Sequence, residues 1–541
     1  MRIKCTSPSL LFKIWMTVFY TFFIVLILAI HVHAQGQISS NYDSFPFEEK
    51  DIEWFQNAYA NDEITVREVI QAYINRIQEI DLNGHQLKSV IMVNPHALII
   101  ADSLDLSKNK GINPGPLFGI PVLLKDNINT KDKMPCTAGS RALADSYPSE
   151  DAFIVKKLRD AGAVILGKAN LSEWANFRGE LSSSGWSGIG GQTKNPYVLD
   201  RNPCGSSSGS GVSVSANLTV LAIGTETNGS IVCPSNNNGI VGIKPTVGLM
   251  SRTGIIPISF TQDSGGPMAR SLKDAVICLG TMTGSDPMDS KTIESDDKKH
   301  TDYTLFLKEN GLQGKKIGIF TGPLNISFRV DTLFYRAIHL MEKMGASFVE
   351  IDEIANASTG GLSFEIMLYE YKDGLNKYFT SLGEESTIKS LEDLIAFNNK
   401  DEVEMVNYNQ KYLQMANSKD GLESKDYNKK LKTMLKQARD EGIDRVMDEY
   451  ELDAIIAPTC SPAWKTDPIN GDNYIMSSSS PSAWAGYPII SLPMGFVDAL
   501  PVNISFFGRA WSEAELITLA YSYEQASMHR KPPKFIKTLE K

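Results

Sequence analysis

The spacing of apolar and polar residues alternates between helical and strand-like patterns in the first part of the chain. Thr65 and Glu68 form a capping-box pair at the start of a predicted helix. The apolar residues of that helix fall on one face: Val69, Ile70, Tyr73, Ile74, Ile77 and Ile80. Short apolar runs at 119–124 and 163–166 predict buried strands, and residues 149–160 between them predict a helix. This alternation predicts a layered α/β fold.

The second half of the chain contains further apolar runs separated by charged helical sequence. Residues 286–303 are charged and rich in helix breakers, which predicts a surface loop. Residues 315–320, 454–457 and 489–492 predict strands. Residues 382–450 predict helices, and one apolar face is traced by Leu431, Met434, Leu435, Ala438, Ile443, Val446 and Met447. We therefore expect one large α/β domain over residues 35–541, with a helical elaboration at about 300–450.

The N-terminus has the pattern of a secretory signal peptide. Three basic residues lie before and around the start of an apolar run at 14–30, and small residues follow at 32–34. We expect residues 1–34 to be removed after Ala34, so that the mature protein is secreted or lumenal. The alternative is a signal anchor, with residues 14–30 holding the protein in a membrane. Membrane contact is expected only if this segment stays uncleaved.

The charge balance restricts the partners. The full chain of 541 residues has a formal net charge of −10. Loss of residues 1–34 would lower it to −13, because that segment holds three basic and no acidic residues. An acidic surface without a compact Lys/Arg patch disfavours nucleic acid and anionic membranes as partners.

The cysteines do not indicate a metal site. After loss of Cys5, five remain: Cys136, Cys204, Cys233, Cys278 and Cys460. An odd number leaves at least one thiol free or paired between chains. No CxxC or Cys/His spacing is present, so we expect neither a metal nor a cofactor. Cys204 and Cys233 flank two serine-rich loops, but the sequence does not show whether they are bonded.

Those two loops carry the strongest chemical signal. Residues 205–211 read Gly-Ser-Ser-Ser-Gly-Ser-Gly, and residues 225–230 read Thr-Glu-Thr-Asn-Gly-Ser. Glycine allows the backbone N–H groups to approach a ligand, and serine supplies a hydroxyl nucleophile. Together they indicate acyl transfer by a serine, which needs a base to take its proton.

Histidine is not the obvious base, because none of the seven lies between residues 97 and 299. A lysine can act when burial keeps it neutral. Lys125, Lys168 and Lys244 each follow an apolar or glycine-rich run, and Lys125 follows the most strand-like one. The residues alone leave this choice open. Each of the three could equally be a lysine at a strand end that reaches solvent.

A second interpretation of the first loop is a nucleophile elbow. Residues 205–209 fit G-x-S-x-G, the motif of α/β hydrolases, with His529 as the remaining candidate base. That motif requires a strand directly before it. Residues 197–204 contain proline and several polar residues, which disfavours this alternative.

The motifs together resemble the amidase signature hydrolases over roughly residues 50–530. Besides the two serine loops, the matching blocks are residues 167–173, 242–248, 263–270 and 485–488. The resemblance implies an α/β fold with a large central mixed β-sheet covered by helices on both faces. It also implies an amidase, a hydrolase that cleaves carboxamides through an acyl-enzyme without a cofactor.

The family's Ser–cis-Ser–Lys triad maps onto single positions. Ser230 is similar to the nucleophile, Ser206 to the bridging serine after a cis peptide bond, and Lys125 to the base. The resemblance further implies an oxyanion hole from the backbone N–H groups of Thr227, Asn228, Gly229 and Ser230. Lys168, Lys244 and Asp263 then become structural residues. Asn228 and Val232 depart from the family, where glycine and arginine are frequent.

The resemblance implies that the substrate is a small-molecule or peptide amide. Residues 186–197 and 254–260 resemble the peptide amidase branch, so our best expectation is the C-terminal amide of peptides. Two alternatives remain: the ammonia-producing subunit of a tRNA amidotransferase, and an inactive homologue kept for binding. The secretory pattern disfavours the first, and the intact triad residues disfavour the second.

Overall fold

The computed structural model describes residues 45–110 and 115–540. The predicted signal peptide and its anchor alternative lie outside these residues. By their contacts the residues fall into two units, Met1–Glu48 and Glu49–Lys541. In the first, the described residues 45–48 form a turn closed by a bond from the Glu48 N–H to the Phe45 carbonyl. In the second, no described helix has the length and apolarity to cross a membrane.

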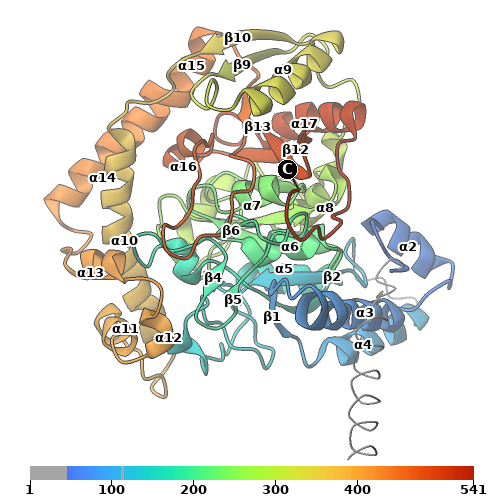
Figure 1. The fold of residues 1–541 in the computed structure, drawn as a ribbon, viewed down its shortest axis with the longest axis vertical. Coiled ribbons are helices and arrows are strands. Elements are labelled where there is room, and N and C mark those ends of the chain that lie inside the picture. Colours follow the sequence, from blue (N-terminus) through green and yellow to red (C-terminus); the bar gives the residue numbers. More distant parts are fainter. Residues whose placement is uncertain (1–44, 111–114, 541) are drawn as a thin grey trace, which may run out of the picture. The chain divides into compact units, whose positions relative to one another are not determined.

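A mixed sheet of eleven strands forms the centre of the second unit (Figure 1). The strands are β1 (Val90–Val93), β2 (Pro121–Lys125), β3 (Val164–Ala169), β6 (Leu221–Glu226), β7 (Val241–Lys244), β8 (Ser264–Ala269), β9 (Lys316–Phe320), β10 (Ser347–Ile351), β11 (Ala454–Pro458), β12 (Ile489–Val497) and β13 (Leu500–Phe507). Their order in the sheet is β1-β3-β2-β6-β8-β7-β12-β13-β11-β9-β10. A separate two-stranded sheet joins β4 (Trp186–Ser187) to β5 (Gly191–Gln192).

The strand pairings explain which strands the sequence could predict. β2 lies between β3 and β6 and is parallel to both, and all its residues are buried. Strands covered on both faces read as continuous apolar runs, which is the pattern found for β2, β3 and β11. β8 has the sequence Ser-Gly-Gly-Pro-Met-Ala and gives no such signal, although it pairs with both β6 and β7. A Cβ at Gly266 would lie 2.0 Å from the Ile243 carbonyl oxygen, so this close approach requires glycine.

Helices cover both faces of the sheet. They are α2 (Ile52–Ala60), α3 (Val66–Arg76), α4 (Ala97–Asn109), α5 (Phe153–Asp160), α6 (Ser208–Ser215), α7 (Val232–Asn237), α8 (Leu272–Met282), α9 (Phe328–Lys343), α10 (Thr359–Ser381), α11 (Leu391–Asn398), α12 (Glu402–Met405), α13 (Lys411–Asn417), α14 (Lys425–Ala438), α15 (Asp444–Glu449), α16 (Ser480–Ala485) and α17 (Glu513–Ser527). The predicted capping box is confirmed at α3, where Thr65 and Glu68 make both reciprocal bonds.

The region from 300 to 450 combines sheet and helices. β9 and β10 form one edge of the sheet, and the helices α10 to α15 follow them in the chain. Of the predicted apolar face of residues 431–447, Leu431 and Leu435 are partly buried and the other five residues are buried, and a break at Arg439–Ile443 divides the face between α14 and α15. Residues 286–303 differ from the predicted surface loop. A 3-10 helix occupies Ser290–Ser295, and Asp286, Asp289 and Tyr303 are buried.

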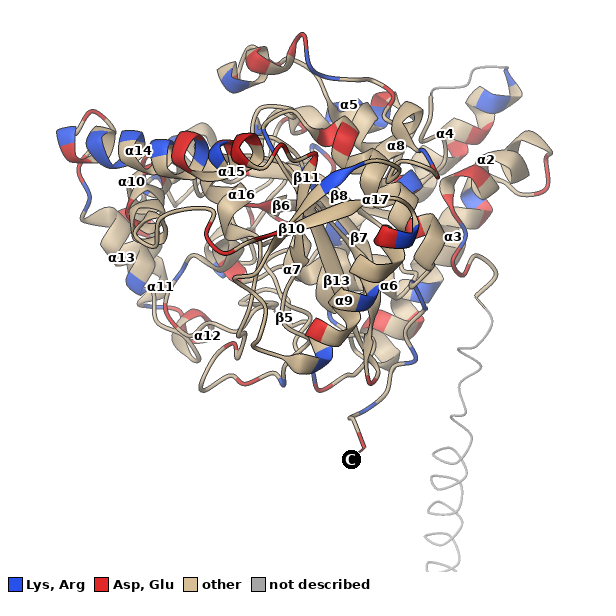
Figure 2. Ribbon diagram, turned by 90° about the horizontal axis from the view of Figure 1, so that it is seen from above, with Lys and Arg blue, Asp and Glu red and all other residues tan. Residues whose placement is uncertain are grey.

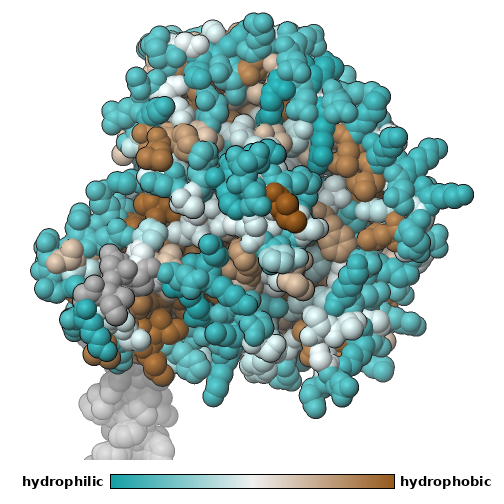
Figure 3. All heavy atoms as spheres, turned by 180° about the vertical axis from the view of Figure 1, so that it is seen from behind, coloured by the Kyte–Doolittle hydropathy of each residue, from teal (hydrophilic) through white to brown (hydrophobic). Residues whose placement is uncertain are grey.

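The surface carries charge of both signs. In Figure 2, Lys predominates along α14 and Asp/Glu along α15, whereas the central strands are largely uncharged. Figure 3 shows that on the opposite face from Figure 1 the hydrophobic side chains form small groups separated by hydrophilic ones.

Candidate active site

Lys125 is the last residue of β2 and is fully buried. Its Nζ lies 2.8 Å from Oγ of Ser206, and 3.0 and 2.9 Å from the backbone and side-chain oxygens of Thr225. These three oxygens belong to uncharged groups. Burial lowers the pKa of Lys125 to about 7, although the carboxylates of Asp263 and Glu226 act in the opposite direction. A lysine in this position is neutral in a large fraction of molecules near pH 7.

Ser206 lies in the irregular segment between β5 and α6. The peptide bond from Gly205 to Ser206 is cis, as the family resemblance implied. The Ser206 carbonyl accepts a bond from the Ser172 N–H, and the Ser207 N–H donates to the Ser230 carbonyl. The second of these bonds ties the two serine loops together. The Ser206 hydroxyl is thereby held next to Lys125.

The second serine loop follows β6. Oε2 of Glu226 accepts the N–H groups of Ile231 and Val232, and this fixes the turn from the strand into α7. Within the described chain, the backbone N–H groups of residues 227–230 donate to no protein acceptor. Gly229 has φ +84°, a left-handed conformation that favours glycine. The loop therefore presents unused donors beside Ser230, as an anion-binding turn does.

Side-chain contacts hold this loop from two sides. Oγ1 of Thr227 donates to Asp263, which also accepts the N–H groups of Ile258 and Ser259. On the other side, Oδ1 of Asn228 accepts a bond of 2.7 Å from the Ser479 hydroxyl. Asn228, which departs from the frequent family glycine, is therefore an anchor between the loop and the segment before α16.

A cavity of about 540 Å³ contains both serines. Ser206, Ser230 and residues 227–229 line one wall, and aromatic and apolar side chains line the others: Phe177, Leu181, Ile258, Met367, Tyr412, Trp464 and Tyr474. Met367 and Tyr412 come from α10 and α13, so the helical region completes the outer wall. Polar side chains, among them Asn176, Ser184 and Asp472, also line the cavity, so that it offers both apolar contacts and hydrogen-bond partners to an organic substrate.

The other two candidate lysines lie elsewhere. Nζ of Lys168 donates to the Ile128 carbonyl and pairs with Asp126 at 3.4 Å. Nζ of Lys244 donates to the carbonyls of Pro245 and Tyr487. Burial lowers the pKa of Lys244 to about 8. Neither side chain contacts a serine of the two loops, so both serve the packing of the strand ends.

The nucleophile-elbow alternative does not fit the structure. No strand directly precedes residues 205–209, and α6 begins within them at Ser208. His529 lines a different cavity of about 300 Å³, together with Arg270 and Glu524. The strand that would present the serine and the histidine that would activate it are both missing from this position.

Two residues near Lys125 were not predicted. Thr225 contacts the amine through two oxygens, and Nδ2 of Asn127 donates to the Thr225 hydroxyl at 3.0 Å. Both belong to sequence blocks that resembled the family, which was the available signal. Their contacts with Lys125 and with each other depend on the pairing of β2 with β6, and hydrophobic periodicity does not predict which strands pair.

The cysteines form an additional group at the cavity. Cys204 and Cys233 are joined by a disulfide and line the cavity, and Cys136, Cys278 and Cys460 are buried free thiols. The sulfurs of Cys204, Cys233 and Cys460 lie within 4.8 Å of one another. Three thiolates at this spacing could bind a metal ion. The disulfide removes two of them, so we assign no metal to this form.

Several known proteins are similar to this chain over most of its length. The peptide amidase PAM, in complex with the competitive inhibitor chymostatin, superposes with a TM-score of 0.88 and 46% identity, over 90% of this chain and 100% of that one. A probable amidase of Arabidopsis thaliana is 39% identical, over 94% of this chain and 96% of its own. One component of the glutamyl-tRNA(Gln) amidotransferase of Methanosarcina barkeri is 31% identical, over 89% of this chain and 98% of its own.

The sequence model of the amidase family matches residues 68–517. This range contains the whole central sheet, both serine loops and Lys125. The predicted fold is confirmed as well, since the mixed sheet flanked by helices is shared with the peptide amidase. The chain therefore belongs to the amidase signature family and is an amidase, a hydrolase of amide bonds.

Proposed function

We propose that this enzyme cleaves carboxamides with Ser230 as nucleophile, Ser206 as proton bridge and Lys125 as base. The contact of 2.8 Å between the buried Lys125 amine and the Ser206 hydroxyl carries the proposal. A neutral amine has two N–H donors and one lone pair. The two oxygens of Thr225 can accept both N–H groups, and the lone pair is then left for the Ser206 hydroxyl proton. This is the arrangement that a general base requires.

The proposed reaction has two halves. Lys125 takes the proton of Ser206, which takes the proton of Ser230 as its oxygen attacks the amide carbon. The free N–H groups of residues 227–230 stabilise the negative oxygen of the tetrahedral intermediate. The proton returns through Ser206 to the leaving nitrogen, so that ammonia or an amine departs. Water then repeats the path on the acyl-enzyme and releases the acid.

The substrate class that we propose is the C-terminal amide of peptides. The similarity to the peptide amidase PAM at 46% identity supports it. The cavity offers about 540 Å³ and several aromatic walls, which suit the side chains of a bound peptide better than a minimal amide. The reaction at this terminus would release ammonia and leave a peptide acid.

We also propose that the enzyme acts outside the cytosol. The support is the pattern of basic, apolar and small residues in residues 1–34. Mass spectrometry of the N-terminus after secretion would test it. A mature chain that starts at residue 35 supports cleavage, and a chain that retains residues 1–34 supports the anchor.

The ammonia-producing component of a tRNA amidotransferase is the second candidate, because such a protein is 31% identical over 89% of this chain. The two functions differ in their need for partners. The purified protein is incubated with an amidated peptide, the free-acid peptide and glutamine, and the products are measured by mass spectrometry. Conversion of the amidated peptide to its acid by the isolated chain supports the peptide amidase function.

Other outcomes of this experiment are equally decisive. Ammonia release from glutamine alone favours the amidotransferase function. No reaction, combined with no labelling of Ser230 by a fluorophosphonate probe in the folded protein, favours an inactive binding homologue. Ser230→Ala is the control that should lose both reaction and label.

A further inference from the structure

The disulfide joins the two loops that hold the serines. Cys204 lies two residues before Ser206, and Cys233 lies three residues after Ser230. Both cysteines line the cavity and are 6% exposed. A change in this bond therefore acts directly on the spacing between the two loops.

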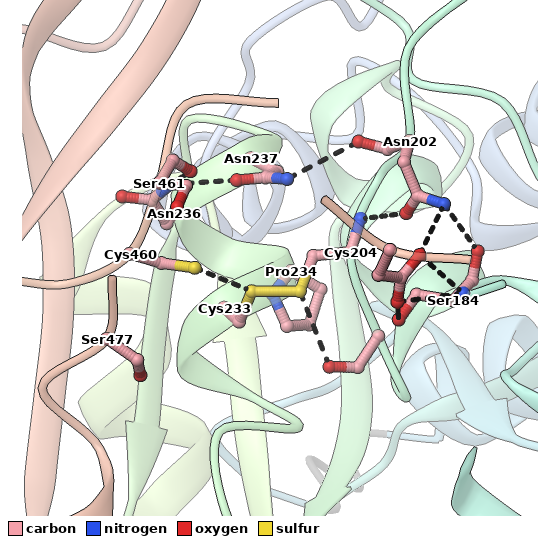
Figure 4. Close-up of a disulfide and its surroundings, with 12 residues drawn as sticks. Ser184, Asn202, Cys204, Cys233, Pro234, Asn236, Asn237, Cys460, Ser461 and Ser477 are labelled. Atoms are coloured by element: carbon pink, nitrogen blue, oxygen red, sulfur yellow. Dashed lines mark hydrogen bonds between the residues drawn. A yellow bond between two sulfur atoms is a disulfide. The ribbon is translucent and has the colours of Figure 1, made fainter. Parts of the chain in front are cut away.

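A third sulfur lies against this disulfide. The Cys460 thiol is fully buried two residues after β11, and its Sγ is 3.0 Å from Sγ of Cys233. Trp464 packs on the same three cysteines. In Figure 4 the Cys460 sulfur points at the Cys233 end of the disulfide, from the side away from Cys204. That is the side from which a thiolate must attack Cys233 to displace Cys204.

We propose that Cys204, Cys233 and Cys460 form a thiol–disulfide exchange site in the wall of the active-site cavity. In the exchange Cys460 gives up its proton and its sulfur bonds to Cys233. The bond between Cys233 and Cys204 breaks, and Cys204 leaves as a thiolate that takes up a proton. One disulfide and one thiol are present before and after, so no oxidant or reductant is consumed.

The exchange separates two states of the catalytic loops. Cys204 has φ +59°, a conformation that is unfavourable for a residue other than glycine and must be held by its surroundings. The disulfide and two hydrogen bonds, to Asn202 and from Ser208, hold it. Once Cys204 is released, the segment leading to Ser206 loses its covalent link to α7. In the exchanged state, Ser206 and Ser230 should therefore be less well aligned. That this lowers the amidase activity rests on the proposed function.

The resting state is the one with Cys204 bonded to Cys233. Burial raises the pKa of the Cys460 thiol to about 12, so the attacking thiolate is scarce near neutral pH. A small thiol that enters the cavity can reach the disulfide in its wall and speed the conversion, as thiols do in other proteins.

Disulfide mapping of the whole protein tests the exchange without any substrate. Cys204 and Cys233 lie in one tryptic peptide, residues 202–252, because Lys244 is followed by proline. Cys460 lies in another, residues 446–465. The protein is incubated in a glutathione redox buffer, quenched by alkylation in acid and digested. Exchange appears as a new cross-link between these two peptides. Digests that retain the bond within 202–252, or show it reduced, with no cross-link overturn the proposal.

Variants then fix each state. In Cys204→Ser the oxidised protein should carry the cross-link between Cys233 and Cys460, and kcat/KM should fall at least tenfold. In glutathione buffer, Cys460→Ser should keep the bond within 202–252. It should also keep the activity that the parent protein has before incubation in that buffer. Cys278→Ser, which removes a buried thiol on α8, is the matched control and should map like the parent.

If Cys204→Ser folds but Cys233 and Cys460 are both found alkylated after oxidation, the proposed exchange is refuted. If Cys204→Ser does not fold, the mapping of the parent protein decides alone. A parent protein that forms the cross-link but hydrolyses no amide would retain the exchange site and refute the proposed function instead.

Discussion

Two helices of this enzyme, α6 and α14, differ in almost every respect. All eight residues of α6 are buried, and its sequence is Ser-Gly-Ser-Gly-Val-Ser-Val-Ser. In α14, by contrast, the buried residues are Tyr427, Met434 and Ala438 out of fourteen, and six of the other eleven are charged. The first continues from the loop of Ser206, and the second packs on α10 behind the outer wall of the cavity. The residues to which we assign the chemistry thus lie next to a wholly buried helix. The helices that enclose the substrate in our proposal are amphipathic.

The difference predicts that substitutions in the buried region act on the chemical step. Ser230→Ala has the largest expected effect, because no acyl-enzyme can form without its hydroxyl. Loss of a serine nucleophile in other triads costs about 10⁶-fold in kcat. Burst kinetics and fluorophosphonate labelling measure it. Ser235→Ala, a buried serine on α7, is the control and should label normally. Labelled Ser230→Ala protein would place the nucleophile at another residue.

Lys125→Met should lower kcat/KM by several powers of ten, on the scale of triad deletions. The parent should show the pH dependence of a base that must be neutral. With a pKa of Lys125 of about 7, log kcat/KM rises by about one per pH unit below that value and levels off above it. Lys244→Met is the comparison. A flat profile from about pH 5 to 8, or a Lys125→Met variant of nearly full rate, contradicts the role of base.

A buried ion group connects the segment after β3 to α12 in the helical region. The Arg178 guanidinium, 0% exposed, donates to Glu173, to both the side chain and the carbonyl of Glu404, and to the Tyr408 carbonyl. Arg178→Met leaves buried carboxylates without their partner and should lower the free energy of unfolding by about 3–5 kcal/mol. Urea denaturation measures it. The control is Lys436→Met, whose ion pair with Glu441 is open to solvent and should change the free energy of unfolding little.

Substitutions in the helical region should act on substrate affinity. Tyr412→Ala removes an aromatic wall of the cavity contributed by α13. Loss of such a contact corresponds to about 1–2 kcal/mol, so KM for amidated peptides should rise roughly tenfold with a small change in kcat. A minimal amide such as acetamide should be unaffected. Tyr335→Ala, an exposed tyrosine on α9, is the control. Equal losses with both substrates would remove the distinction between the two regions.

The same contrast explains how much the sequence predicted. The one-faced pattern of residues 431–447 correctly predicted helical structure. The continuous apolar runs correctly predicted strands β2 and β3. α6 gave no helical period, because a helix buried all round has no polar face to mark it. β8 was likewise hidden by its glycines and proline.

The site was predicted unevenly for a similar reason. Residue chemistry reduced the candidates for the base to three lysines that follow apolar or glycine-rich runs. Only the family resemblance selected Lys125 among them. In the structure its amine contacts the Ser206 hydroxyl. Thr225 near the end of β6 and Asn127 in the turn after β2 were missed, because no local sequence pattern marks a polar residue that contacts Lys125. The disulfide between Cys204 and Cys233 was also beyond reach, since pairing depends on the approach of two loops in space.

The four unused N–H groups at 227–230 have a consequence for engineering. A donor that is left without an intramolecular acceptor forgoes stabilisation that folding would otherwise supply. In the mechanism that we propose, these donors stay free because they stabilise the negative oxygen of the tetrahedral intermediate. Searches for heat-resistant variants that reward stability alone will favour side chains that fill this turn, and thermostability gained there will come at the expense of turnover.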